Sequence, residues 1–331
     1  MKATLMTQPG SPETLHYADI SEPDLTAPQQ IKVQLKAAGI NPIDTKLRQR
    51  GLFYENALPS VLGCDGAGVV VATGSAVSRF KEGDKVWFCH GGLGAEQGNY
   101  AQFNVLDERW AAPMPTSLDF ETAAAGPLVL ITAWGALYDR ARLSAGQSVL
   151  IHAGAGGVGH VAIQLAKLRG ARVIATVGSE EKAALVRRWG ADEAINYSTQ
   201  DFVTEVNALT SGQGADVVLD TVGPDTFRRS IDCTAHFGDI VTLLDTGDTS
   251  LKEARMRNLR IGFELMLTPM LRNLDAARAH HVDILEQCGT LIDAGKLALH
   301  LERVFSLEQA AEAHRLIETG HMTGKAVLRI G

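Results

Sequence analysis

The sequence has few cysteines, no long apolar run and no excess of basic charge. Its four cysteines are scattered and include no C-x-x-C pair, which argues against a disulfide framework or a zinc ribbon and favours a reducing cytoplasm. No apolar run reaches membrane-spanning length, so no membrane association is expected. The net charge of −7 argues against a nucleic-acid partner, because phosphate binding needs concentrated Lys and Arg. We therefore expect a soluble protein acting on a small molecule.

A chain of 331 residues with 45% hydrophobic and 21% charged residues has the balance of a globular protein with one large or two modest domains. The first 120 residues resemble short strands broken by Gly and Pro, and residues 31–36 alternate apolar and polar side chains. The last 60 residues return to mixed character, with a predicted helix at 275–294 and a strand at 326–330. Both ends therefore predict a compact, mainly antiparallel unit.

Between these ends, strands and helices alternate. A helix at 121–137, interrupted at Gly126 and Pro127, is followed by predicted strands at 148–152, 172–175, 193–196, 215–220 and 239–244. The predicted helices between them are 157–169, 179–189, 201–209 and 224–235. Such alternation predicts right-handed crossovers and a parallel sheet, and the nearly continuous apolar strands fit a sheet covered on both faces.

The sharpest motif is a glycine loop between the strand at 148–152 and the helix at 157–169. Gly154-x-Gly156-x-x-Gly159 has the spacing of a dinucleotide-binding turn. The first glycine permits the turn, the second lets the backbone approach a pyrophosphate, and the third allows close packing of helix and strand. A merely structural turn is the alternative. The residues predicted to contact the cofactor here are Ala153, Gly154, Gly156, Gly157, Val158 and Gly159.

The end of the second strand of this unit favours NADP(H) over NAD(H). An NAD site usually places a carboxylate there, about 20 residues after the glycines, whereas this chain has Gly178 and Ser179. These residues can offer N–H and hydroxyl groups to a 2′-phosphate, and Lys182 can offer charge. Against this, Lys182 is also an ordinary solvated lysine, and Glu180 and Glu181 oppose a phosphate.

At this point the chain resembles the medium-chain dehydrogenase/reductase superfamily, in its zinc-independent quinone oxidoreductase (zeta-crystallin-like) branch. The resemblance runs nearly end to end, through residues 37–44, 62–68, 80–86, 130–134, the glycine loop, 220–223 and 324–328. It implies an α/β fold in which a Rossmann doubly wound parallel sheet domain (123–266) is inserted in a mainly antiparallel β, GroES-like catalytic domain (1–122 plus 267–331). It also implies an active site between the domains and a homodimer formed through the edges of the Rossmann sheets.

The resemblance also identifies the positions where zinc alcohol dehydrogenases carry metal ligands. Asn41 stands in place of the first cysteine, and Cys64 stands in place of a histidine. Zinc needs three or four convergent S, N or O ligands, and no matching partner appears for Cys64 and Asp65. We therefore predict no metal site, and interpret Cys64 as a small buried apolar residue.

Candidate catalytic residues follow from the same resemblance. Related reductases place the equivalent of Asn41 beside the nicotinamide, where its amide can donate to a substrate oxygen. Thr132 is expected near the nicotinamide ribose or ring. Tyr54 is either a proton donor to an enolate or an ordinary surface tyrosine, and Asp44 either orients the loop of Asn41 or caps a helix.

Further cofactor residues are implied by the aligned motifs. Tyr197 aligns with a tyrosine near the 2′-phosphate or adenosine, and residues 220–223 end a strand at the cofactor edge. The backbone after the next strand is expected to bind the carboxamide. The remaining predicted cofactor residues are Thr221, Val222, Leu243, Leu244 and Lys325.

Together these features predict an NADPH-dependent reductase that transfers hydride to quinones or α,β-unsaturated carbonyl compounds. Without a Lewis acid, alcohol oxidation loses its main means of stabilising an alkoxide, whereas a conjugated acceptor spreads the charge. Two other functions stay open: a zinc-type alcohol or carbonyl dehydrogenase, and a non-catalytic NADPH-binding protein.

Overall fold

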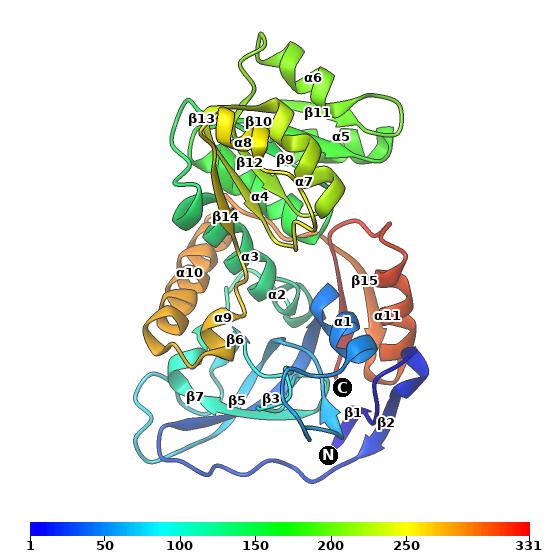
Figure 1. The fold of residues 1–331 in the computed structure, drawn as a ribbon. Helices are drawn as coiled ribbons and strands as arrows, with labels where there is room; N and C mark the ends of the chain where they lie inside the picture. Colours follow the sequence, from blue (N-terminus) through cyan, green and yellow to red (C-terminus); the bar gives the residue numbers. More distant parts are fainter. The chain divides into compact units, whose positions relative to one another are not determined.

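The computed structural model describes residues 1–331, which divide into two compact units. Unit 1 combines Met1–Leu128 with Leu267–Gly331, and unit 2 is Val129–Met266. Figure 1 shows unit 2 in greens and yellows, and unit 1 in the colours of the two ends of the chain. The sequence placed the first boundary after residue 122, whereas the units divide after Leu128. None of the helices combines the length and apolar character needed to cross a membrane.

Unit 1 is built mainly from strands. These are β1 (Lys2–Met6), β2 (Leu15–Asp19), β3 (Gln30–Ile40), β4 (Ser60–Val61), β5 (Asp65–Thr73), β6 (Lys85–Cys89), β7 (Phe103–Asp107), β8 (Ala112–Pro113), β15 (Leu301–Ser306) and β16 (Lys325–Arg329). Its α-helices are α1 (Pro42–Arg50), α2 (Phe120–Ala124), α9 (Thr268–Leu271), α10 (Asp275–Asp293) and α11 (Ala310–Glu318), and its 3-10 turns are η1 (Pro12–Thr14), η2 (Glu108–Trp110) and η5 (Leu307–Gln309).

Strand β3 organises the larger sheet of unit 1. The seven-stranded sheet has the order β15-β16-β3-β5-β6-β8, with β7 also on β3, and only β15 and β16 pair in parallel. A three-stranded sheet has the order β2-β1-β4. The apolar side chains of β3 that alternate with polar ones, from Ile31 to Leu35, are fully buried. The mainly antiparallel unit predicted from both chain ends is therefore confirmed.

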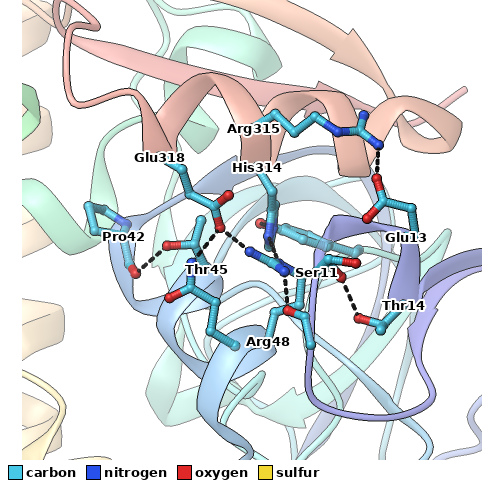
Figure 2. Close-up of polar contacts among 12 residues, drawn as sticks. Ser11, Glu13, Thr14, Pro42, Thr45, Arg48, His314, Arg315 and Glu318 are labelled. Carbon is cyan, nitrogen blue, oxygen red and sulfur yellow. Dashed lines mark hydrogen bonds and ion pairs between the residues drawn. The ribbon is translucent and has the colours of Figure 1, made fainter.

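The C-terminal segment completes the N-terminal fold. In the register of β16 against β3, Ala326 lies opposite Ile40. Figure 2 shows a second connection, in which Arg48 of α1 meets His314 and Glu318 of α11. The Nε of Arg48 donates to Nδ1 of His314 at 3.3 Å, and the Arg48 side chain is buried. Segments far apart in sequence therefore belong to one unit.

Unit 2 alternates strands and helices. The strands are β9 (Ser148–Ile151), β10 (Arg172–Val177), β11 (Glu193–Asn196), β12 (Ala215–Asp220), β13 (Thr234–Thr242) and β14 (Arg260–Phe263). The helices are α4 (Gly157–Leu168), α5 (Glu180–Arg188), α6 (Phe202–Leu209), α7 (Pro224–Ser230) and α8 (Lys252–Met256), with a 3-10 turn η4 (Ile231–Cys233). Helix α3 (Pro127–Trp134) crosses the division and continues as a π-helix, η3 (Gly135–Arg140).

The six strands of unit 2 form one parallel sheet in the order β11-β10-β9-β12-β13-β14. The predicted alternation and parallel pairing are confirmed. One predicted helix is wrong at its end, because α7 stops at Ser230 rather than Ala235. The reason is strand pairing: Thr234 lies opposite Ala215 of β12, and Cys233 is buried in the core beneath the sheet. Burial and pairing outweigh a local helical pattern here.

Candidate functional site

The glycine loop joins β9 to the N-terminus of α4. Gly156 is the N-cap of α4 and has no side chain to cap the N–H groups of the first turn. A Cβ at Gly159 would lie 2.4 Å from the carbonyl oxygen of Ala153, so only glycine fits there. A Cβ at Gly154 would lie 2.8 Å from that of Ala175. The turn therefore offers oriented N–H donors to an anion, in the geometry suited to a pyrophosphate.

The buried His152 supports the glycine loop through hydrogen bonds. The N–H of Ala153 donates to Oγ1 of Thr176 at 3.2 Å, and the same hydroxyl lies 3.1 Å from Nδ1 of His152. Nε2 of His152 lies 2.9 Å from Oγ of Ser230, which donates to the carbonyl oxygen of Thr226. Ser230 therefore accepts from Nε2–H, and Nδ1 accepts from Thr176. Burial lowers the pKa of His152 to about 3, so the ring is neutral.

The end of β10 carries no carboxylate. A Cβ on Gly178 would lie 2.7 Å from the hydroxyl oxygen of Tyr197, so this tyrosine, 57% exposed, leans over the Gly178 backbone. Oγ of Ser179 caps α5 by accepting the N–H of Lys182 at 3.3 Å. The nearby Glu180 accepts from the amide of Asn196 at 2.8 Å. The predicted 2′-phosphate residues Gly178, Ser179, Lys182 and Tyr197 therefore lie at one end of the sheet.

A buried aspartate shapes the loop after β12. Oδ1 of Asp220 accepts from the N–H groups of Val222 at 3.0 Å and Gly223 at 3.2 Å. Its Oδ2 accepts from the hydroxyl of Thr242 at 2.8 Å, and that hydroxyl oxygen also accepts the N–H of Leu244. Burial raises the pKa of Asp220. Asp220 was not among the predicted site residues, although its place at the end of an apolar strand was noted.

The strand ends of unit 2 therefore gather most of the predicted cofactor residues. The hydroxyl of Thr221 donates to the carbonyl oxygen of His152 at 2.9 Å, which joins the loop after β12 to the glycine loop. Thr132 lies on α3 and is buried. The predicted residues at or just beyond the carboxyl ends of β9, β10, β11, β12 and β13 are Ala153, Gly154, Gly156, Gly157, Val158, Gly159, Gly178, Ser179, Tyr197, Thr221, Val222, Leu243 and Leu244.

In unit 1, Asn41 lies in a buried polar cluster where β3 gives way to α1. The ammonium of Lys325 donates to the carbonyl oxygen of Ile40 at 2.8 Å and to Oδ1 of Asn41. Nδ2 of Asn41 donates to Oδ2 of Asp65 at 2.9 Å. The Lys325 nitrogen lies 3.9 Å from the same carboxylate oxygen. All three side chains are at most 2% exposed, so the cluster holds a buried ion pair bridged by an amide.

Asp44 holds the backbone beneath Asn41. Its Oδ2 accepts the N–H of Asn41 at 2.8 Å in a capping box, and accepts the hydroxyl of Tyr100 at 3.0 Å. That hydroxyl lies 3.2 Å from Nε2 of His314, which leads to Arg48. Oδ1 of Asp44 is buried without a partner. Burial raises the pKa of Asp44 to about 7. The two interpretations of Asp44, as a helix cap and as a residue that orients the loop of Asn41, therefore describe the same hydrogen bond from the Asn41 N–H.

Two other predicted residues lie differently. Lys325, predicted to contact the cofactor, is 2% exposed, and its ammonium is engaged by the cluster around Asn41. Tyr54 is 36% exposed and lies outside any helix or strand. Tyr100 and His314 were not predicted, because nothing in their local sequence marks them as members of a buried polar chain.

The cluster around Asn41 does not suit zinc. Asn41 already uses its oxygen for Lys325 and its nitrogen for Asp65, and an ammonium repels a second cation. A hydrogen bond with Cys89, together with burial, raises the pKa of the Cys64 thiol well above its ordinary value. A thiol that stays protonated is a poor ligand. No group of three His, Cys, Asp or Glu side chains in the chain is placed to hold a metal ion.

Family models and curated relatives match most of this chain. Residues 27–116 match the model of the alcohol dehydrogenase GroES-like domain, and residues 189–328 match that of a zinc-binding dehydrogenase. A quinone oxidoreductase of Pseudomonas aeruginosa is 38% identical over 323 residues, 96% of each chain. A 2-haloacrylate reductase of a Burkholderia species is 31% identical over 98% of each chain.

Solved structures agree in fold over the whole chain. The quinone oxidoreductase of Escherichia coli, complexed with NADPH, has a TM-score of 0.89 at 31% identity and covers 100% of both chains. A structure described as an NAD-dependent alcohol dehydrogenase has a TM-score of 0.91 at 36% identity, also covering 100% of both chains. The predicted α/β fold, with a Rossmann-type sheet and a GroES-like unit, is confirmed by these similarities.

Proposed function

Because this chain belongs to the medium-chain dehydrogenase/reductase superfamily, among its quinone oxidoreductases, we propose that it is a metal-independent, NADPH-dependent reductase of quinones or α,β-unsaturated carbonyl compounds. The observation that carries the proposal is the cluster at Asn41. There, an amide is held between an ammonium and a carboxylate, at a position that the resemblance aligns with a metal ligand of zinc dehydrogenases. Such a site can donate a hydrogen bond to a substrate oxygen and cannot act as a Lewis acid.

The strand ends of unit 2 fit the dinucleotide. The uncapped N–H groups at the start of α4 would hold the pyrophosphate. Gly178, Ser179, Lys182 and Tyr197 would surround the 2′-phosphate, and the absence of a carboxylate at the end of β10 favours NADPH over NADH. The backbone of Leu243 and Leu244 and the side chain of Thr132 are assigned to the nicotinamide end. When bound, NADPH supplies the hydride.

Unit 1 supplies the groups that act on the substrate. Asp65 accepts one Nδ2 hydrogen of Asn41, and the second is assigned to the substrate oxygen, where negative charge develops as the acceptor is reduced. Because Asn41 is fully buried, this contact requires the side chains around it to move when the substrate binds. A conjugated acceptor spreads that charge, so a single amide donor is enough for useful stabilisation. The oxyanion is then protonated by water, or by the phenol of Tyr54, which is exposed to solvent.

The edge of the sheet in unit 2 supports a homodimer. Strand β14 ends the six-stranded sheet, and Phe263 at its end is 58% exposed, with Leu265 nearby at 50%. An open edge beside apolar side chains favours pairing with a second copy of this chain. Light scattering after gel filtration tests this, with Phe263→Ser expected to shift the chain toward the monomer. The four free thiols favour a reducing, cytoplasmic location.

The function is tested by following NADPH oxidation with 1,4-benzoquinone, 9,10-phenanthrenequinone and a short 2-alkenal, and by repeating each assay with NADH. Turnover with NADPH well above that with NADH supports the proposal, and the ranking of acceptors narrows the substrate. A search for alcohol oxidation with NADP⁺ or NAD⁺ is the counter-assay. Alcohol oxidation that depends on added zinc would overturn the proposal. Tight NADPH binding without turnover on any acceptor would favour a non-catalytic binding protein.

A further inference from the structure

The ammonium of Lys325 is the one full positive charge in contact with Asn41. It faces three oxygens: the Ile40 carbonyl at 2.8 Å, Oδ1 of Asn41, and Oδ2 of Asp65 at 3.9 Å. An ammonium has three donors and no acceptor, so this surrounding is the one expected of the charged form. Burial lowers the pKa of Lys325, whereas Asp65 raises it. The chain keeps a buried cation at this point although a neutral side chain would cost less to bury.

Lys325 and Asp65 fix the orientation of the Asn41 amide. The oxygen faces the ammonium and the nitrogen faces the carboxylate. The reverse orientation would place the amide NH₂ against the ammonium and the amide oxygen against the carboxylate, which is repulsive at both ends. Asn41 therefore has one orientation, and its second Nδ2–H points in one defined direction.

The ammonium contacts the amide more closely than the carboxylate. Asp65 already accepts from Nδ2 of Asn41 at 2.9 Å and from the backbone N–H of Leu128 at 2.9 Å, so both of its oxygens are satisfied by N–H donors. Lys325 stays 3.9 Å away from it and donates instead to Asn41. A lysine that only neutralised Asp65 would be expected to bond to it directly.

We propose that Lys325 is a positioning residue that polarises the Asn41 amide, so that the charge of the ammonium acts on the substrate oxygen through Asn41. A cation at the amide oxygen draws electron density away from the nitrogen, and this makes the N–H that does not face Asp65 a stronger donor. Asp65 offsets part of that effect and holds the orientation. The inference rests on the proposed function, because it requires Asn41 to meet the substrate.

The test uses a charge-balanced double variant. Lys325→Met alone leaves Asp65 buried without a cation, which destabilises the fold. Lys325→Met combined with Asp65→Asn removes both charges. Asp65→Asn alone, which loses the same N–H acceptor but keeps the ammonium, is the reference for it. We expect this double variant to fold and to bind NADPH as the wild type does, with kcat lowered roughly 10- to 100-fold, somewhat less than for removal of an oxyanion donor itself. Lys325→Arg, which keeps the cation, is expected to retain more activity than the double variant.

A second measurement detects the effect of the Lys325 charge without catalytic turnover. 4-Nitrophenol is an oxyanion analogue whose absorbance reports its ionisation when it is bound to the NADP⁺ complex. In the wild-type protein we expect the pKa of the bound phenol to lie below its value in water. In the double variant it is expected to rise by about one to two units, which corresponds to the loss in kcat.

The matched control is an exposed Lys–Asp pair. Lys2 and Asp19 are in contact at 2.7 Å, with side chains 42% and 75% exposed, and Lys2→Met/Asp19→Asn is expected to change neither readout. Wild-type kcat and phenol pKa in the Lys325 double variant would overturn the inference and leave Lys325 as a mere counter-charge. A wild-type phenol pKa no lower than in water would overturn it as well. Loss of the phenol shift only in the double variant, with no reductase activity in any form, would retain the polarised amide and reject the reductase function.

Discussion

Nδ1 of His152 lies 3.1 Å from the hydroxyl of Thr176, which in turn accepts the N–H of Ala153 at the start of the glycine loop. Thr176→Val removes this hydroxyl and leaves a buried N–H and a ring nitrogen unpaired. We expect the Kd for NADPH to rise about tenfold, because an unpaired buried polar group costs about 1–3 kcal/mol and part of that cost is expressed in the loop. Fluorescence titration measures the Kd, and Thr176→Ser, which keeps the hydroxyl, should bind normally. If the valine variant binds NADPH as tightly as the wild type, the hydrogen bonds of Thr176 to His152 and Ala153 do not contribute to cofactor binding.

Activity is expected to fall as the pH rises through about 7. The pKa of Asp44 is raised to about 7 by burial, and its carboxyl faces the Asn41 N–H, the Tyr100 hydroxyl, Asp65 and Lys325. Ionisation adds a second negative charge beside Asn41, which opposes an oxyanion on the substrate. The profile of kcat against pH checks this, and Asp44→Asn should flatten it between pH 6 and 8.5. An unchanged profile in that variant would assign the titration to another group.

Acid is expected to destabilise the fold through buried histidines. Burial lowers the pKa of His90 to about 4, and of His152 and His314 to about 3, below the value of about 6.5 in an unfolded chain. Well above pH 6.5 all three are neutral in both states, so their titration does not change the free energy of unfolding. As the pH falls below 6.5, these histidines take up protons in the unfolded chain but stay neutral in the folded chain. The free energy of unfolding therefore falls by about 1.4 kcal/mol per pH unit for each histidine.

Urea unfolding at pH 7.5, 6 and 5 measures this loss. His314→Gln keeps groups that can pair with Arg48 and Tyr100 but does not titrate, so its stability should fall less steeply with acid than that of the wild type. Parallel slopes for the two proteins would show that His314 titrates normally when folded.

Removal of metals is expected to have no effect. The cluster around Asn41 holds an ammonium against the amide oxygen, and the Cys64 thiol resists ionisation. Dialysis against a chelator should therefore leave NADPH-dependent turnover unchanged, and dialysis against Zn²⁺ should leave less than one zinc per chain in mass spectrometry. Stoichiometric zinc, with activity lost on chelation, would contradict the expectation.

Lys182 is expected to contribute to cofactor preference. It lies in the first turn of α5, where its backbone N–H is accepted by Oγ of Ser179 at 3.3 Å. Lys182→Met should lower kcat/KM for NADPH about fivefold and leave that for NADH nearly unchanged, since a partly exposed charge contributes about 1 kcal/mol to phosphate binding. Arg187→Met, later on the same helix, is the matched control. A parallel loss with both cofactors would place Lys182 in the fold rather than at the phosphate.

The parallel sheet and the glycine turn were predictable because their determinants are local. Each strand of unit 2 is an apolar run, and Gly154, Gly156 and Gly159 occur at a spacing with a direct geometric reason. The end of α7 was not predictable from local pattern, since the pairing of Thr234 with Ala215 decides it.

The polar cluster of unit 1 was predictable only in part. Aligned motifs marked Asn41, Cys64 and Lys325, and Lys325 was predicted to contact the cofactor. The structure adds its neighbours Asn41, 284 residues away, and Asp65, and no periodicity connects positions so far apart. The role of His152 could not be predicted for a different reason. It follows an apolar strand, and only its hydrogen bonds with Thr176 and Ser230 explain why a polar ring is buried there.

The late arrival of Lys325 has a consequence for biosynthesis. Unit 2 is one continuous stretch, so it can fold as soon as it leaves the ribosome. Unit 1 cannot, because Asn41 and Asp65 emerge long before the lysine that sits beside them. Until β16 emerges, β3 presents an open edge, and the carboxylates of Asp44 and Asp65, which are buried in the folded chain, stay hydrated. The nascent chain is therefore a folded unit 2 attached to an incomplete sheet, which makes the translation of the last segment the period of greatest exposure to proteases and chaperones.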